Sequence, residues 1–150
     1  MTVYRIIHTK YAEHLIASGL SNRWNLSGQF VIYTSTSKAL ACLENLVYAS
    51  GETLRSGLYR CLEIFIPDTV TITTISLKEL PDNFNNEELK THTQKIGNNW
   101  YTQNKHLLLK VPSAIIPSEN NVIINSKHDD FKKVKINKTE KFVFDKRLKK

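Results

Sequence analysis

Hydrophobic and polar positions alternate in short blocks along this chain, and the blocks predict many strands and few helices. Runs rich in Val, Ile, Thr and aromatic residues that end at Gly, Pro or Asn are typical of β-strands. Such runs predict strands at residues 3–8, 30–34, 58–66, 70–75, 107–111 and 122–124. Residues 133–136 and 141–144 are expected to form a closing hairpin around Asn137 and Lys138.

Helical patterns are expected at residues 10–17, 37–50 and 86–104. Gly19 is expected to end the first helix. Ser35 or Ser37 is expected to cap the start of the second helix, which stops near Gly51. The third helix can break near Gly97. A polar loop is expected at residues 18–29 and a turn region at residues 77–86. Because strands outnumber helices and do not strictly alternate with them, the pattern favours an α+β fold over a doubly wound sheet.

One charged residue interrupts the apolar stripe of the second helix. Leu40, Leu43 and Val47 have the spacing of a buried helical face, and Glu44 completes that stripe. A carboxylate on a core-facing position costs several kcal/mol unless it is paired and hydrogen-bonded. Two readings follow: a cation lies opposite Glu44, with Arg23 as the best candidate, or the helix lines a ligand cleft.

Composition predicts one packed domain that spans residues 1–150. The hydrophobic fraction is 41%, and the sequence has no apolar run of the roughly 18 residues that a membrane span needs and no signal-peptide block. Cys42 and Cys61 give neither a disulfide framework nor metal spacing, so both are expected to be reduced packing residues. The five histidines show no metal spacing either. We therefore expect a cytoplasmic protein without a metal site.

The positive charge is concentrated at the C-terminal end. Residues 1–131 hold twelve basic and twelve acidic residues, whereas residues 132–150 hold nine basic and two acidic ones, which accounts for the net charge of +7. A basic terminus can bind nucleic acid or an acidic partner. The alternative reading is that this segment is a solvated edge strand, which its lysines keep soluble. The segment has no recognisable nucleic-acid motif, and most of its charge comes from Lys.

The residues that can carry chemistry are scattered at strand ends and in loops. The sequence has no phosphate-binding glycine loop, dinucleotide fingerprint or nucleophile elbow. What remains is the set Arg5, Arg23, Trp24, Asn25, Tyr33, Glu44 and Ser113. These types suit a nucleotide: Arg binds pyrophosphate, aromatic rings stack on a base, and Glu binds ribose hydroxyls or stabilises an oxocarbenium ion. A buried Arg–Glu structural pair with a capping Ser is the alternative.

Several blocks along the chain together match one family. They are Tyr4-Arg5-Ile6, Ser18-Gly19, Arg23-Trp24-Asn25 with Gly28, the run 31–35 followed by 39–44, the run 96–100, Leu109 to Ser113, 117–121 with Asn125, Asp130-Phe131 and the run 144–148. Through these blocks the sequence resembles the RES-domain family, toxins of bacterial toxin–antitoxin modules named for an Arg, a Glu and a Ser. The resemblance covers essentially the whole chain. One departure is Ser126-Lys127, where the family often has a Pro.

The resemblance implies a site and a fold. The catalytic residues would be Arg23, Glu44 and Ser113, and the NAD-binding residues Arg5, Trp24, Asn25 and Tyr33. The fold would be a compact α+β domain with mixed and antiparallel sheets, similar to ADP-ribosyltransferases, which bind NAD in a cleft between sheets. Family members deplete NAD by phosphorolysis, hydrolysis or ADP-ribosyl transfer. NAD would thus be a substrate rather than a cofactor, with inorganic phosphate as a co-substrate in the first case.

The resemblance also implies a partner. An Xre-like antitoxin with a helix-turn-helix domain would block the cleft and bind DNA, so the toxin itself is expected to bind neither nucleic acid nor membrane. A homodimer or a toxin–antitoxin hetero-oligomer both fit the family. The rival hypothesis is a non-catalytic module that engages nucleic acid or an acidic partner through residues 132–150.

The mechanism that we expect uses each residue type for one part of NAD. Arg5 and Arg23 bind the pyrophosphate, and Tyr33 packs against the nicotinamide end. Glu44 steadies positive charge as the nicotinamide–ribose bond loosens, and Ser113 orients the ribose or the acceptor.

Overall fold

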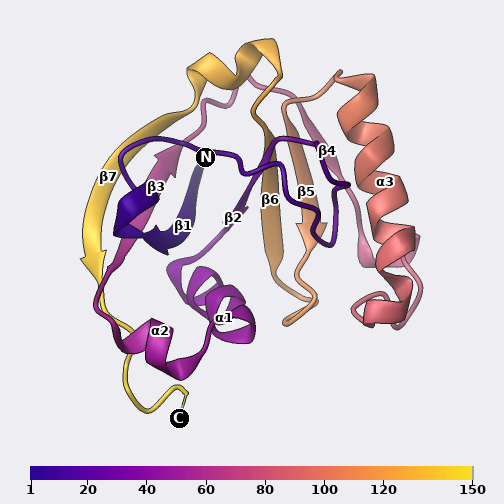
Figure 1. Ribbon diagram of the computed structural model, residues 1–150. Helices are drawn as coiled ribbons and strands as arrows, with labels where there is room; N and C mark the ends of the chain where they lie inside the picture. Colours follow the sequence, from indigo (N-terminus) through magenta and orange to yellow (C-terminus); the bar gives the residue numbers. More distant parts are fainter. Residues whose placement is uncertain (150) are drawn as a thin grey trace.

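The computed structural model describes residues 1–149, and a seven-stranded sheet runs through them (Figure 1). The strands are β1 (Thr2–His8), β2 (Val31–Ser35), β3 (Tyr59–Phe65), β4 (Ile72–Thr74), β5 (Leu108–Pro112), β6 (Asn120–Asn125) and β7 (Lys135–Phe142). Their order is β4-β5-β6-β2-β1-β3-β7, with β4 and β5 parallel and all other neighbours antiparallel. The α-helices are α1 (Lys38–Tyr48), α2 (Gly51–Arg55) and α3 (Lys90–Gln103). The predicted α+β class is confirmed.

The sheet forks between β1 and β2. β1 pairs with β3 over its full length of seven residues, and β2 pairs with β6 over all five of its residues. Between β1 and β2, however, only Tyr4 and Ser35 are paired. The two halves of the sheet therefore diverge, and α1 lies across the fork with contacts to both strands (Figure 1). This fork places an opening in the middle of the sheet.

The core follows from the alternation of side chains on the strands. Leu108 and Ile124 point to one face of the sheet, whereas their neighbours Leu109 and Ile123 point to the other, because successive residues of a strand face opposite sides. The second face packs against α3 through Trp100. A third cluster joins the β1–β3 half to α1 and α2. The helices thus cover the faces that the strand pattern leaves apolar.

Helix α1 begins as predicted but is shorter than predicted. Ser37 is the N-cap, and its Oγ accepts a hydrogen bond from the Leu40 N–H at 3.1 Å. The helix ends at Tyr48, and the separate helix α2 follows. Leu40 is fully buried, but Val47 is 56% exposed. The predicted buried stripe is therefore right at Leu40 and wrong at Val47, because that end of the helix leaves the core and reaches the rim of a cavity.

The helix predicted at residues 10–17 is wrong beyond its first turn. A 3-10 helix covers Thr9–Tyr11, and the chain then continues without helix. Ala12 is buried in the core and Leu15 and Ala17 pack against it, so tertiary packing outweighs the local helical pattern. The carbonyl of Ile16 accepts a hydrogen bond from Arg5, which fixes this segment beside β1.

The predicted closing hairpin is wrong because its two arms are one strand. β7 pairs with β3 from Lys135 to Phe142, and the register shifts at Glu63 and Ile64. Asn137 is the extra residue of this bulge, and its Nδ2 donates to Glu63 Oε1 at 2.8 Å. β7 is an edge strand with exposed Lys135, Lys138 and Lys141, which fits the reading of the basic segment as a soluble edge. Lys150 lies outside the described residues.

Helix α3 is continuous through Gly97, and a 3-10 turn at Glu87–Leu89 precedes it. Gly97 is buried, and a Cβ atom at this position would lie 1.7 Å from the backbone oxygen of Trp24. Glycine is required here for close packing of the helix on the loop, not for a break. The predicted strand at residues 70–75 shortens to three residues, Ile72–Thr74. Within residues 1–149 no helix has the length and hydrophobicity needed to cross a membrane.

Candidate functional site

A cavity of about 530 Å³ occupies the fork of the sheet. Its walls come from β1, β2, α1, β6 and three connecting segments at residues 22–24, 85–87 and 114–115. The volume lies within the range typical of small-molecule sites. Of the residues predicted to form a site, five line this cavity: Arg5, Arg23, Trp24, Tyr33 and Glu44. Asn25 and Ser113 lie behind its walls, buried with exposures of 1% and 0%.

Glu44 faces the cavity from α1, and hydrogen bonds rather than a cation hold its carboxylate. Oε1 accepts from Asn121 Nδ2 at 2.5 Å and from Ser113 Oγ at 3.0 Å. Within residues 1–149, no hydrogen bond from the protein reaches Oε2. Of the two readings of the interrupted stripe, the ligand cleft is therefore the one that the structure supports. One oxygen of the carboxylate is fixed and the other is free for a ligand.

Ser113 acts on the cavity through Glu44. It follows β5, and besides donating to Glu44 its Oγ accepts from the backbone N–H groups of Ile115 at 3.0 Å and Ile116 at 3.1 Å. The hydroxyl thus joins the turn after β5 to the carboxylate on α1. Because Ser113 is fully buried, its hydroxyl lies behind the carboxylate and away from the cavity wall.

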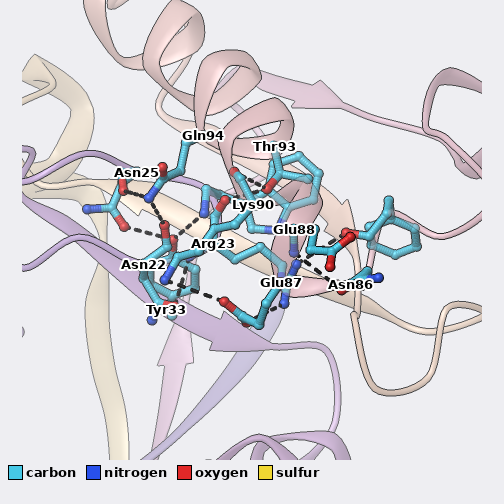
Figure 2. Close-up of polar contacts among 12 residues, drawn as sticks. Asn22, Arg23, Asn25, Tyr33, Asn86, Glu87, Glu88, Lys90, Thr93 and Gln94 are labelled. Atoms are coloured by element: carbon cyan, nitrogen blue, oxygen red, sulfur yellow. Dashed lines mark hydrogen bonds and ion pairs between the residues drawn. The ribbon is translucent and has the colours of Figure 1, made fainter.

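Arg23 pairs with Glu87, so the reading in which Arg23 is the cation opposite Glu44 is wrong. Its Nη2 donates to Glu87 Oε1 at 2.9 Å and its Nη1 donates to the carbonyl of Phe84 at 3.2 Å (Figure 2). The Arg23 side chain is 10% exposed, whereas that of Glu87 is 69% exposed. The alternative of a buried Arg–Glu structural pair is also wrong, because the partner of Arg23 is Glu87 and the Glu87 carboxylate is exposed to solvent.

The N-terminal half of α3 holds the loop that carries Arg23. Thr93 Oγ1 donates to the carbonyl of Arg23 at 2.6 Å, and Gln94 Nε2 donates to the carbonyl of Asn22 at 2.9 Å (Figure 2). Thr93 is fully buried. Together with the close contact at Gly97, these bonds set the position of the loop relative to the sheet.

Tyr33 and Asn25 brace the same loop from the side of β2. The Tyr33 hydroxyl donates to Asn25 Oδ1 at 2.8 Å and accepts from the Trp24 N–H at 3.0 Å. Asn25 Nδ2 in turn donates to the carbonyl of Leu20 at 2.9 Å. Burial raises the pKa of Tyr33 well above its ordinary value, so the hydroxyl stays neutral. Asn25 is therefore a scaffold residue, whereas Trp24 and Tyr33 reach the cavity.

Arg5 supplies positive charge from β1. Its Nη1 donates to the Ile16 carbonyl at 2.9 Å, and within residues 1–149 it makes no ion pair. Burial lowers the pKa of Arg5 to about 10, so the guanidinium remains charged at neutral pH. Among residues 1–149, the Arg5 guanidinium on β1 therefore has no carboxylate partner, and the Glu44 carboxylate on α1 has no cation partner.

Two site residues, Asn121 and Glu87, were not identified from the sequence. Asn121 lies on β6, which was predicted to span only residues 122–124 because Asn has a low strand propensity. Glu87 begins the 3-10 turn before α3. The only available signal for Asn121 was its place in the block 117–121, and that block does not specify which side chains reach a site.

The described residues contain no group of three His, Cys, Asp or Glu side chains that could hold a metal ion. Cys42 and Cys61 are free, as predicted. Burial raises the pKa of both thiols, so neither resembles an activated nucleophile.

Comparison with known proteins gives the family. The RES domain model matches residues 2–145. The "Toxin Res" of Photorhabdus laumondii is 36% identical over 137 residues, which cover 89% of this chain and 86% of the relative. The "Prs ADP-ribosylating toxin" of a Sphingobium species is 34% identical over 145 residues, which cover 93% and 89%.

A solved structure shows the same fold. The crystal structure of the M. tuberculosis MbcT–MbcA toxin–antitoxin complex contains a chain that superposes with a TM-score of 0.79 at 15% identity. The match covers 95% of this chain and 84% of that one. With a family model that spans nearly every residue, two relatives above 30% identity and the shared fold, the resemblance seen in the sequence is confirmed, and this chain belongs to the RES domain family.

Proposed function

We propose that this protein is the toxin of a toxin–antitoxin module and that it cleaves the nicotinamide–ribose bond of NAD. The names of its relatives support the toxin role. One observation carries the chemistry: Glu44 presents its carboxylate to a cavity of nucleotide-binding size, and within residues 1–149 no hydrogen bond reaches Oε2 and no cation pairs with the carboxylate. Such a carboxylate is suited to stabilise a positively charged transition state.

The reaction needs charge stabilisation more than a covalent nucleophile. In NAD the bond between the ribose C1′ and the nicotinamide nitrogen breaks, and its electron pair goes to the nitrogen, so the cationic ring leaves neutral. The ribose carries the resulting oxocarbenium character, which the Glu44 carboxylate stabilises electrostatically. An acceptor oxygen of water or phosphate, or a protein nucleophile, then forms the new bond to C1′ and gives up its proton.

The arginines bind the pyrophosphate of NAD. Within residues 1–149 Arg5 has no carboxylate partner, and it stays charged at neutral pH; a guanidinium offers planar, paired donors to phosphate oxygens. Arg23 lines the same cavity but is engaged by Glu87. Tyr33 lines the wall beside them and provides aromatic surface for the nicotinamide end, whereas Trp24 is 3% exposed and packs in the hydrophobic core. Ser113 and Asn25 act as positioning residues.

Glu87→Gln is expected to lower the KM for NAD about two- to fivefold and to leave kcat unchanged. A surface ion pair is worth about 0–1 kcal/mol, and a dinucleotide phosphate that contacts Arg23 has to displace the Glu87 carboxylate. Steady-state kinetics at low and high salt measure the effect, which shrinks as salt screens the pair.

Glu88→Gln is the matched control, because Glu88 is the exposed neighbour and its side chain does not contact Arg23 (Figure 2). It should leave KM unchanged. A KM that rises in Glu87→Gln would show that Glu87 orients Arg23 for the ligand and does not compete with it.

The reaction type is tested with purified protein and NAD, with and without inorganic phosphate, by following nicotinamide and the ADP-ribose product together. Release that depends on phosphate and gives a phosphorylated product means phosphorolysis. Release without phosphate means hydrolysis, and label that remains on protein means ADP-ribosyl transfer. Folded protein that releases no nicotinamide under any of these conditions, including with cell extract as a source of acceptor, would contradict the proposed function.

A cognate antitoxin is the partner that fits this function. The exposed Val47 and Tyr48 at the end of α1 lie on the rim of the cavity and offer apolar surface to a covering segment. That the antitoxin carries the DNA-binding domain remains a prediction from the family. We expect toxicity only when the antitoxin is absent or degraded.

A further inference from the structure

We propose that Asn121 is a positioning residue that fixes the Glu44 carboxylate so that Oε1 is held by the protein and Oε2 faces the ligand. The inference rests on the proposed cleavage of NAD. Asn121 lies on β6 and was not among the residues that the sequence identified; it lines the same cavity as Glu44 on α1.

The orientation of the Asn121 amide is determined by its neighbours. Ser35 on β2 is the paired residue of Asn121 across the β2–β6 ladder. The Ser35 hydroxyl donates to Asn121 Oδ1 at 2.8 Å, which turns Nδ2 towards Glu44 Oε1, 2.5 Å away. The reverse orientation would bring the Asn121 amide oxygen against a carboxylate oxygen with no proton between them. A single orientation therefore satisfies all three side chains.

The two hydrogen bonds to Glu44 come from different parts of the sheet. Asn121 lies within β6, and Ser113 follows β5. Both donors bind the same oxygen, so the terminal carboxylate loses its rotational freedom while its second oxygen stays available. Fixing a reactive group in this way lowers the entropy cost of reaching the transition state, and a misplacement of about 1 Å can cost on the order of 10²-fold in rate.

The network also ties α1 to one half of the forked sheet. Ser35, Asn121 and Ser113 all belong to the β4-β5-β6-β2 half, or to the turn that follows β5. Arg5, by contrast, lies on β1 in the other half. The distance between the carboxylate and the arginine that are expected to act on the two ends of NAD therefore depends on this set of hydrogen bonds together with the contacts of α1 with β1, among them the hydrogen bond from Asn45 Nδ2 to the Ile6 carbonyl at 3.2 Å.

The variants Asn121→Asp and Asn121→Ala distinguish the effect of losing the hydrogen-bond donor from the effect of changing the shape of the side chain. Asp has nearly the shape of Asn and can accept from Ser35, but it cannot donate to Glu44 and puts a second negative charge beside it. Both variants should lower kcat for nicotinamide release about 10- to 100-fold and change the KM for NAD by less than about threefold. Asp should be at least as damaging as Ala.

Asn120→Asp is the matched control. Asn120 is the preceding residue on β6, so its side chain points to the opposite face of the sheet. The same substitution there should leave kcat within about twofold of the wild type, because a carboxylate on that face does not contact Glu44.

The outcomes separate the inference from the proposed function. An active wild type with a fully active Asn121→Asp overturns the inference alone, since it would show that only shape matters at this position. If Asn121→Asp does not fold, as judged by its melting curve, Ser35→Ala decides: a lower kcat at unchanged KM supports the inference, and an unchanged kcat overturns it. A folded wild type that releases no nicotinamide overturns the proposed function and the inference with it.

Discussion

Glu44→Gln is expected to lower kcat for nicotinamide release by about 10²–10³-fold and to abolish growth inhibition, while the protein stays folded. The amide oxygen of Gln can still accept from Asn121 and Ser113, so the hydrogen bonds that support α1 are kept. What is lost is the negative charge that faces the developing oxocarbenium ion. Removing one such electrostatic contact typically costs about 2.7–4 kcal/mol in the barrier.

Kinetics with purified protein and growth curves of cells that express it measure this effect. Glu52→Gln is a suitable control, because Glu52 is an exposed carboxylate on the neighbouring helix α2. It should retain full activity and full toxicity. Should Glu44→Gln inhibit growth as strongly as the wild type at equal expression, the carboxylate has no catalytic role. An unfolded Glu44→Gln would instead assign Glu44 to stability.

Gly97→Ala is expected to destabilise the protein by about 3 kcal/mol, the upper end of the usual cost of overpacking. In an ordinary helix the same change stabilises by roughly 1 kcal/mol, so the sign of the effect is informative. Here the added Cβ would lie 1.7 Å from the backbone oxygen of Trp24. Either α3 moves away from the sheet, or the loop that carries Arg23 and Trp24 moves into the cavity.

Urea unfolding gives the stability change, and kcat/KM reports the displacement of the loop. Lys95→Ala, at an exposed position two residues earlier on α3, should change stability by no more than about 0.5 kcal/mol. A Gly97→Ala protein that is both as stable and as active as the wild type would mean that α3 does not pack this closely on the loop. A variant that is fully stable but inactive would indicate that the loop carrying Arg23 and Trp24 moves, rather than α3.

Local sequence patterns predicted the parts of the fold in which the local preference for helix or strand agrees with the tertiary packing. The Ser37 cap and the buried Leu40 define the start of α1, and both could be identified from spacing alone. Asn137 was misread because an Asn followed by a Lys between two β-rich runs is also typical of a turn. A bulge in an edge strand uses the same residue types, and the pairing with β3 decides between them.

The sequence predicted five of the residues that line the cavity, but it did not predict how their side chains are connected. Glu44 could be identified because a charge in an apolar stripe is costly, and the family resemblance supplied the other residues. The pairing of Arg23 with Glu87 joins residues 64 positions apart, and no local pattern contains that information. For the same reason the sequence could not show that Ser113 supports the carboxylate from behind while Arg5 faces the cavity.

The fork between β1 and β2 determines what the peptide backbone can offer to a ligand. In the part of the chain that the structure describes, Tyr4 and Ser35 form the only paired position between these strands, and the ladder does not continue on either side of it. Residues of both strands border the cavity there, among them Ile6 and Tyr33. The separation that creates the binding space therefore also leaves main-chain donors and acceptors of the two strands unmatched with each other. Under the proposed function, NAD can use these groups, whose positions are fixed by the outer neighbours β3 and β6; the Ile6 carbonyl already accepts a hydrogen bond from Asn45 Nδ2 at 3.2 Å.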